Sequence, residues 1–473
     1  MSETFYAKLA LIVLSSIAVR WSIAKHDYSG YNKPPMFGDF EAQRHWMEIT
    51  VNLPPHQWYT NTTENDLLYW GLDYPPLTAY HSFLCGLLAK WINPDWVALN
   101  TSRGLQTYHH KLFMRYTVLF ADLLTYIPAC ILVFISQYSY SENDKLKGIV
   151  VLLLLPGLAL IDYGHFQYNG VSLGLTLMAT WALGIKWDLL GAVLFCLALN
   201  YKQMELYHAL PFFCYLLGSC FQLGTARGSI KLMMLAMVVL ISFGFCWLPF
   251  LSSIEAVHSV LVRLFPFNRG LYEDKVANFW CTLSVLIKLK AILTVENLVF
   301  LCLGSTVLLL LPSSVHLLVK PSIKRFKLAL INSSLVFFLF SFHVHEKSIL
   351  LALVPSCLQV VDQPLAISWF ISISSLSMLP LLVKDGLLIP AIATTVLSME
   401  LIRLFFTPLH GKPFVLKLLY TASLIGSCLL AVVSQTLTPP PHLPDLYTVM
   451  IAAYCFAHFA VFLVYFHYLQ LTS

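Results

Sequence analysis

The sequence predicts an all-α polytopic membrane protein, and three observations carry that prediction. Hydrophobic residues make up 58% of the 473 positions and charged residues only 11%, with a mean hydropathy of +0.72. Apolar stretches of about twenty residues, the length of a membrane-spanning helix, recur along the chain. Polar motifs are confined to short segments between them. A soluble core of this size cannot bury so much apolar surface, and a net charge of +5 without a long basic tract argues against nucleic-acid binding.

The apolar stretches number roughly fourteen by the length rule. The first, 5–24, is similar to a secretory signal, but Arg20 and Trp21 interrupt the region of cleavage, so we interpret it as an uncleaved span. The other predicted spans are 112–137, 148–164, 170–184, 187–200, 206–223, 230–250, 292–312, 327–342, 348–361, 365–383, 387–405, 416–436 and 446–470. We expect two membrane modules, 1–250 and 251–473.

The loop between the first two spans, 25–111, is too long and too polar to be a turn. We expect it to form a small extramembrane cap with helices of its own. Asp39 precedes a helix-like run that ends before Pro54. A second run, 77–92, follows two prolines and has a mostly apolar face, which suits a helix lying in the membrane interface.

The basic residues of the shorter loops predict the orientation, because cytosolic loops of membrane proteins are enriched in Lys and Arg. With a cytosolic N-terminus, the even-numbered spans end beside Lys145, Lys147, Arg227, Lys231, Lys320, Lys324, Arg325, Lys327, Arg403, Lys412 and Lys417. An even number of spans also predicts a cytosolic C-terminus. The glycosylation sequons at Asn61 and Asn100 then lie in the lumen, although such triplets also arise by chance.

All motif-like polar segments fall on the opposite, lumenal face in this scheme. They are GDFEAQRHW (38–46), LDYPPLT (72–78), IDYGHFQYNG (161–170), NYKQMELYH (200–208), FPFNRGLYEDKVANFW (265–280) and HVHEKS (343–348). This clustering predicts a single lumenal site that handles polar ligands.

Two aspartates are candidates for a general base. Asp39 either accepts a proton from a sugar hydroxyl in a partly dry cleft or caps the helix that follows it, and the two roles are compatible. Asp73 precedes Tyr74 and two prolines, which fix an extended backbone and hold the carboxylate in place. Ordinary turn chemistry is the alternative for Asp73, so we keep it as the reserve.

The segment with His343, His345, Glu346 and Lys347 lies at the lumenal mouth of a predicted span. Two histidines two positions apart, with no nearby Cys or Asp, are a poor metal site. A phosphate clamp is favoured, and anchoring at the membrane interface is the alternative.

The remaining candidates are predicted to bind substrate. They are Arg44, His45, Tyr74, His165, Gln167, Asn169, Lys202, Glu205, Arg269 and Lys275. Polar groups at membrane depth are costly unless they are satisfied, so structural hydrogen-bond networks are the alternative for those within or near spans. For Arg269 and Lys275, pairing with the neighbouring acids is the alternative.

Taken together, the motif segments, with WGLDYPPLTAYHS (70–82) and HVHEKSIL (343–350), resemble the endoplasmic-reticulum dolichyl-phosphate-glucose-dependent α-1,3-glucosyltransferases. These are C-type glycosyltransferases, and the resemblance covers about 30–350 of the chain. It implies dolichyl phosphate glucose as donor, dolichyl-pyrophosphate-linked Man9GlcNAc2 as acceptor, and neither metal nor other cofactor. Asp39 matches the acidic residue of the family's first lumenal loop. The part after 350 carries no motif that matches and is expected to be a more variable membrane module.

The resemblance implies an inverting reaction, in which a mannose 3-hydroxyl attacks the glucosyl anomeric carbon. A phosphate leaving group needs no general acid, so one carboxylate base suffices, with cations near the phosphate. Two alternatives stay open. One is the sister enzyme that adds the second glucose; the other is a lipid or solute transporter, which explains the large first loop poorly and for which no inverted repeat is visible.

Overall fold

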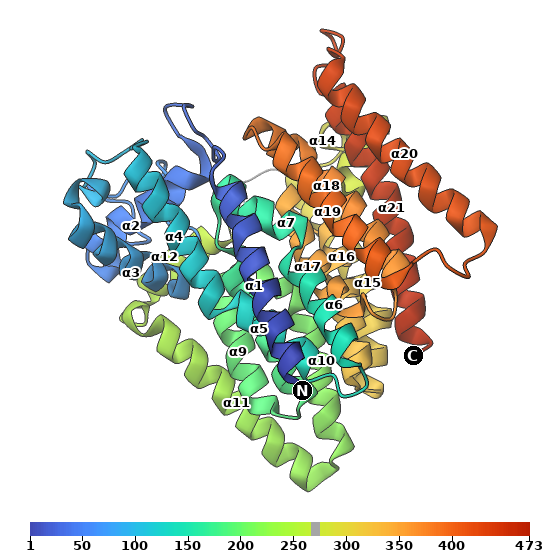
Figure 1. Cartoon of the computed structure of the whole chain (residues 1–473). Helices are drawn as coiled ribbons and strands as arrows, with labels where there is room; N and C mark the ends of the chain where they lie inside the picture. Colours follow the sequence, from blue (N-terminus) through green and yellow to red (C-terminus); the bar gives the residue numbers. More distant parts are fainter. Residues whose placement is uncertain (266–274) are drawn as a thin grey trace.

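The computed structural model describes residues 1–265 and 275–473, and within these ranges it is helical with no β-strand (Figure 1). The elements of the first half are α1 (Glu3–Ala24), α2 (Gly38–Asn52), η1 (Pro55–Gln57), α3 (Pro76–Ile92), η2 (Pro94–Val97), α4 (Tyr108–Leu124), α5 (Tyr126–Ile135), α6 (Glu142–Leu153), α7 (Pro156–Ala159), η3 (Leu160–Phe166), α8 (Asn169–Gly184), α9 (Asp188–Tyr201), η4 (Gln203–Glu205), α10 (Leu206–Gln222) and α11 (Thr225–Trp247).

The second half continues with short and long helices in alternation. Its elements are η5 (Leu248–Phe250), α12 (Ile254–Leu264), α13 (Phe279–Leu286), α14 (Leu289–Ile292), α15 (Val295–Val319), α16 (Ile323–Phe340), η6 (Glu346–Ile349), α17 (Leu350–Ser356), η7 (Cys357–Gln359), α18 (Pro364–Lys384), α19 (Leu388–Phe406), α20 (Phe414–Thr436) and α21 (Leu446–Leu471). The segment η3 is a π-helix, a rare form that recurs at functional sites.

Every apolar stretch predicted as a span overlaps one of these helical segments. Nine helical segments of the described residues are long and apolar enough to cross a bilayer. Some of the helices that overlap predicted spans are shorter: α8 has 16 residues and α9 has 14. The protein is therefore a multi-pass membrane protein, as predicted, and the figure of roughly fourteen spans stays a prediction.

The loop 25–111 forms the expected cap, in which α2 packs against α3. Pro76 opens α3 at the first helical position, where its missing N–H is no loss. The cap has its own apolar core, which includes Trp46 and Trp58 together with Phe250 and Leu264 from the region of η5 and α12. Helix α12, although distant in sequence, thus packs into the core of the cap.

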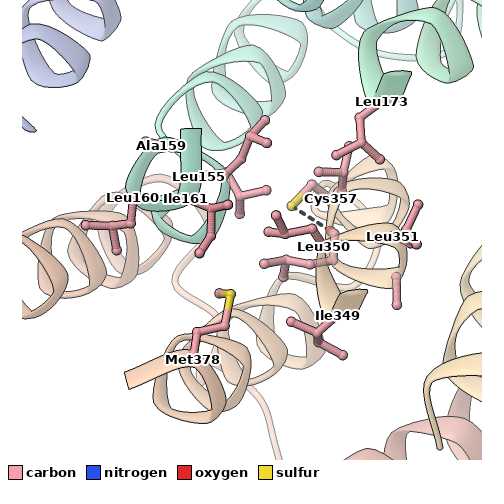
Figure 2. Close-up of a cluster of buried hydrophobic side chains, with 14 of the residues drawn as sticks. Leu155, Ala159, Leu160, Ile161, Leu173, Ile349, Leu350, Leu351, Cys357 and Met378 are labelled. Carbon is pink, nitrogen blue, oxygen red and sulfur yellow. Dashed lines mark hydrogen bonds between the residues drawn. The ribbon is translucent and has the colours of Figure 1, made fainter. Parts of the chain in front are cut away.

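Behind the cap, α7 and η3 pack against α17 and α18 through a buried apolar cluster (Figure 2). Leu160, Ile161 and Leu350 are no more than 1% exposed. At Gly157 the chains approach so closely that a Cβ would lie 2.7 Å from Cε of Met378. This packing fixes the position of η3 relative to the segment that carries Lys347.

A buried ion pair joins α1 to α4. Nε of Arg20 lies 3.1 Å from Oδ2 of Asp122, and both side chains are at most 3% exposed. The Tyr163 hydroxyl donates to the same oxygen at 3.0 Å. Removing one partner of such a pair leaves an uncompensated buried charge, so the pair holds α1, α4 and η3 together.

Figure 1 shows the N- and C-termini at the same end of the bundle, and the cap helices α2 and α3 beside the other end of α1. This is the arrangement that an even number of crossings produces.

Candidate active site

Under the cap lies a cavity of about 470 Å³, a size typical of small-molecule sites, which we call the main cavity. It is lined by side chains from α2, α8, η4, α12, η6, α17 and the connection between η1 and α3. The predicted site residues that line it are Asp39, Asp73, Tyr74, Gln167, Asn169, Lys202, His345 and Lys347. Five of the six motif segments therefore contribute side chains to one cavity, and the described part of the sixth, 265–280, does not line it.

Asp39 is the second residue of α2, and the N-cap position is occupied by Phe37 without a side-chain capping bond. The alternative considered for Asp39, that its side chain caps this helix, is therefore wrong. Its backbone N–H donates to Oγ of Ser29 at 3.3 Å. This leaves the carboxylate free to turn away from the helix and into the main cavity.

One oxygen of Asp39 contacts three side chains. Oδ2 accepts from Nε2 of Gln167 at 2.6 Å and lies 3.0 Å from Nε2 of His165. Nζ of Lys347 forms an ion pair with the same oxygen. Burial opposes ionisation of this carboxylate, but Lys347 and His165 together hold the pKa of Asp39 well below its usual value. Asp39 is thus an anion at any physiological pH.

A second layer of polar groups supports this arrangement. Lys202 donates to Oδ1 of Asn169 and, at 3.4 Å, to Oε1 of Gln167. Asn169 in turn donates to Oδ1 of Asp162 at 2.7 Å. Burial and the charge of Lys347 lower the pKa of Lys202 to about 8, and its ammonium lies 5.0 Å from the centre of the Tyr74 ring. The layer fixes the amide of Gln167 that donates to Asp39.

A side cavity of about 330 Å³ adjoins the main cavity. The two share Asp73, Tyr74, Met204, Arg263 and His345, and His343 lines only the side cavity. Its other walls are mostly apolar and belong to α10, α12, α15 and α16, including Leu206, Leu264, Val299 and Phe337. A largely polar junction therefore separates a chamber of mixed lining from a more apolar one.

Comparison with known proteins places the chain in a family. A model described as the ALG6, ALG8 glycosyltransferase family matches residues 12–465. The chain belongs to this family. A Gallus gallus relative named dolichyl pyrophosphate Man9GlcNAc2 alpha-1,3-glucosyltransferase is 50% identical over 98% of this chain and 96% of its own length. A Rattus norvegicus relative of the same name is 50% identical over 97% and 96%. A Drosophila melanogaster relative, named as probable, is 44% identical over 97% of both.

Family membership makes this protein a multi-pass glycosyltransferase and confirms the resemblance predicted from its motifs. Arg44 and His45, both predicted to bind substrate, lie outside the main and side cavities. Arg44 is fully buried and pairs with Glu41 at 2.6 Å and Glu48 at 2.7 Å. His45 is also buried, with Nδ1 3.3 Å from Glu48. Neither lines the main or the side cavity, and their ion pairs stabilise the cap; a role in substrate binding stays a prediction.

The other predicted residues are distributed as follows. Glu205 is buried and lies 2.6 Å from Nδ1 of His208, away from both cavities. Lys275 pairs with Asp445 at 3.1 Å and lines neither cavity. Arg269 lies outside the residues that the structure describes.

Arg263, which lines both cavities, and Asp385, which contacts His165, were missed by sequence reasoning. Oδ2 of Asp385 lies 2.6 Å from Nδ1 of His165, and both side chains are at most 5% exposed. Asp385 comes from the part after 350, which carried no matching motif. The only signal was a Lys-Asp-Gly turn between two apolar stretches, which is also what an ordinary connection contains.

Proposed function

We propose that this protein transfers glucose from dolichyl phosphate glucose to dolichyl-pyrophosphate-linked Man9GlcNAc2, forming an α-1,3 linkage with inversion. The acceptor and linkage are those in the names of relatives that match nearly its whole length. The observation that carries the proposal is the Asp39 carboxylate, which lines the main cavity with a lysine on one of its oxygens.

Asp39 acts as the general base. In an inverting transfer the mannose 3-hydroxyl attacks the anomeric carbon from the face opposite the phosphate and loses its proton as the bond forms. A carboxylate that is ionised before substrate binds, and fixed by Gln167 and His165, suits this task. Asp73 lines both cavities and is the reserve, placed to contact a sugar hydroxyl near the junction.

The donor phosphate binds at the polar junction, where His345 and Arg263 line both cavities and Lys347 stands beside them in the main cavity. Cationic and imidazole donors form strong, charge-assisted hydrogen bonds to phosphate oxygens. The glucose then enters the main cavity, and the apolar dolichyl chain follows the side cavity past Leu206 and Phe337. Leu206 is 41% exposed, so this wall opens toward the surroundings of the bundle.

Lys347 has two roles in this scheme. Without substrate it pairs with Asp39. When the donor binds, Lys347 turns to the phosphate, stabilises the negative charge that leaves with it, and frees Asp39 to accept a proton.

We further propose that the protein resides in the endoplasmic-reticulum membrane, with the main cavity lumenal and both termini cytosolic. The Lys and Arg bias of the loops supports this orientation. Both sequon residues, Asn61 and Asn100, are exposed and belong to the cap that covers the main cavity. The first module, 1–250, supplies the base, and the second, 251–473, supplies Lys347.

The decisive experiment measures glucose transfer by the purified full-length protein in lipid nanodiscs. Dolichyl phosphate glucose is the donor, and lipid-linked Man9GlcNAc2 or Glc1Man9GlcNAc2 is the acceptor. We expect transfer to the first acceptor only. Transfer to the second acceptor alone would assign the sister reaction, and transfer to neither with intact, folded protein would refute the proposal. The variant Asp95→Asn, an exposed carboxylate at the start of η2, serves as an active control.

A further inference from the structure

His165 lies between two carboxylates. Its Nε2 is 3.0 Å from Oδ2 of Asp39, and its Nδ1 is 2.6 Å from Oδ2 of Asp385. The imidazole is only 3% exposed, so no bulk water replaces these contacts. A carboxylate accepts hydrogen bonds, and a neutral imidazole has a single N–H to donate. The protonation of the two ring nitrogens is therefore set by what surrounds them.

The shorter contact fixes the proton on Nδ1, which donates to Asp385. Nε2 then faces a hydrogen-bond donor and a hydrogen-bond acceptor: Nζ of Lys347 lies 3.1 Å away and Oδ2 of Asp39 lies 3.0 Å away. With its lone pair exposed, Nε2 accepts a hydrogen bond from Lys347. With a proton, it donates to Asp39. Nε2 is thus the one position of the ring at which a proton can be gained or lost without breaking the contact to Asp385.

We propose that Asp385 and His165 form a proton relay behind Asp39, in which Nε2 of His165 takes up the proton that Asp39 removes from the acceptor hydroxyl. This inference rests on the proposed role of Asp39 as the base. Asp385 is a positioning residue: it sets the tautomer and stabilises the imidazolium, as the orienting carboxylate does in a hydrolase triad.

The steps balance as follows. The mannose O–H bond breaks, its proton passes to Asp39, the new bond to the anomeric carbon forms, and the bond to the phosphate oxygen breaks with its electron pair remaining on the phosphate. The O–H bond of Asp39 then breaks, and Nε2 of His165 gains the proton. The proton finally leaves to lumenal water or to the dolichyl phosphate product, whose second ionisation lies near pH 6. Asp39 returns to its anionic form.

The fold holds the relay rigidly. The backbone carbonyl of His165 accepts from the Ser29 N–H at 3.1 Å, and the Ser29 hydroxyl accepts from the Asp39 N–H. Asp385 directly follows α18, whose packing against α7 appears in Figure 2 through Met378. Both ends of the relay are therefore anchored on packed helices.

Several charged groups surround the imidazole and contribute to its proton affinity. Those that face His165 from neighbouring elements are Asp39 from α2, Lys347 from η6, Asp385 after α18 and Arg115 from α4, whose guanidinium donates to the carbonyl of the preceding residue at 3.0 Å. The two carboxylates favour the imidazolium and the two cations oppose it. Removal of Asp385 shifts this balance toward the neutral ring.

The test is the pH profile of kcat between about pH 5 and 8 at saturating donor and acceptor, for wild type, Asp385→Asn and Asp385→Glu. A protonated Nε2 cannot take a proton, so wild-type kcat should fall on acidification. We expect Asp385→Asn to lower kcat by about tenfold to a hundredfold, the usual loss when a residue that orients a functional side chain is removed. The acidic side of the kcat profile should also move to lower pH. KM for both substrates should stay within about threefold. Asp385→Glu should recover much of the rate.

Controls separate this inference from the proposed function. Asp362→Asn, at the opposite end of α18, should leave kcat and its pH profile unchanged. In an Asp39→Asn background, Asp385→Asn should cause no further loss, because both act on one proton. A wild-type profile for Asp385→Asn, beside an inactive Asp39→Asn, would overturn the relay alone, whereas an active Asp39→Asn would overturn the base. Should Asp385→Asn not fold, His165→Gln decides, since glutamine donates hydrogen bonds but takes no proton: full activity there refutes the relay.

Discussion

The variant Asp39→Asn isolates the proposed chemistry because it replaces one carboxylate oxygen with an amide nitrogen and leaves the size of the side chain nearly unchanged. Its carbonyl oxygen can still accept from Gln167, which donates to Asp39 at 2.6 Å. Since Asp39 makes no capping bond, α2 does not depend on its carboxylate. We therefore expect folded protein with a melting temperature near that of wild type.

General-base catalysis is worth about 100-fold to 10,000-fold in rate. Gln167 still donates to Asp39 when Lys347 has turned to the donor phosphate, and such a donor weakens a carboxylate as a base. We accordingly expect the lower half of that range, a loss of about 100-fold to 1,000-fold in kcat. At about 1.36 kcal/mol per factor of ten, this is about 2.7 to 4.1 kcal/mol of transition-state stabilisation.

The assay is steady-state transfer of labelled glucose to lipid-linked Man9GlcNAc2, with both KM values measured alongside kcat. An interaction made only in the transition state lowers kcat and kcat/KM together, so both KM values should change little. Asp95→Asn, in the same cap but outside the main cavity, controls for the loss of a carboxylate. A folded Asp39→Asn enzyme with wild-type kcat would refute the assignment and direct attention to Asp73.

Three further outcomes follow from the same geometry. Lys347→Ala should raise KM for dolichyl phosphate glucose more than KM for the acceptor, since it removes a cation from the phosphate; equal effects on both would count against the junction as the phosphate site. Asp73→Asn should lower kcat less than Asp39→Asn does in the same assay, and a larger effect would exchange their roles. Arg44→Ala should destabilise the fold by about 3–5 kcal/mol, because Glu48 is left as a buried charge. Thermal unfolding in nanodiscs measures this loss, and an unchanged melting temperature would contradict the reasoning.

Orientation has its own test, which needs no activity. A glycosylation sequon added after α21 should remain unmodified if the C-terminus is cytosolic, whereas the cap should accept a glycan at Asn61, which is exposed. A glycan on the C-terminal sequon would reverse the predicted sidedness.

The sequence predicted the helices well because a membrane imposes a length and a composition on each span. It also predicted the position of the cap in the chain and placed the motif segments on one face of the membrane. It could not sort the residues within GDFEAQRHW, because α2 is buried continuously from Phe40 to Thr50 and shows no exposed face. At 3.6 residues per turn, Asp39 and Arg44 point about 140° apart, so one side chain enters the main cavity while the other enters the interior of the cap.

Asp385 was beyond the reach of sequence reasoning for a different reason. Its role depends on the packing of α18 against α7 and η3, a contact between segments more than 200 positions apart. Hydropathy and spacing describe each span alone and contain no information on which spans become neighbours. In the sequence, a charged residue in a short turn between two apolar helices looks the same whether it faces water or a histidine.

The ion pair between Arg20 and Asp122 has a consequence for biogenesis. The two residues are 102 positions apart, so the first helix leaves the ribosome long before its counter-charge exists. Until then the guanidinium must stay in the aqueous channel of the insertion machinery or among lipid headgroups, because an unpaired charge is costly in hydrocarbon. We therefore expect α1 to reach its final depth only when α4 arrives, which would make the entry of the first span dependent on the second.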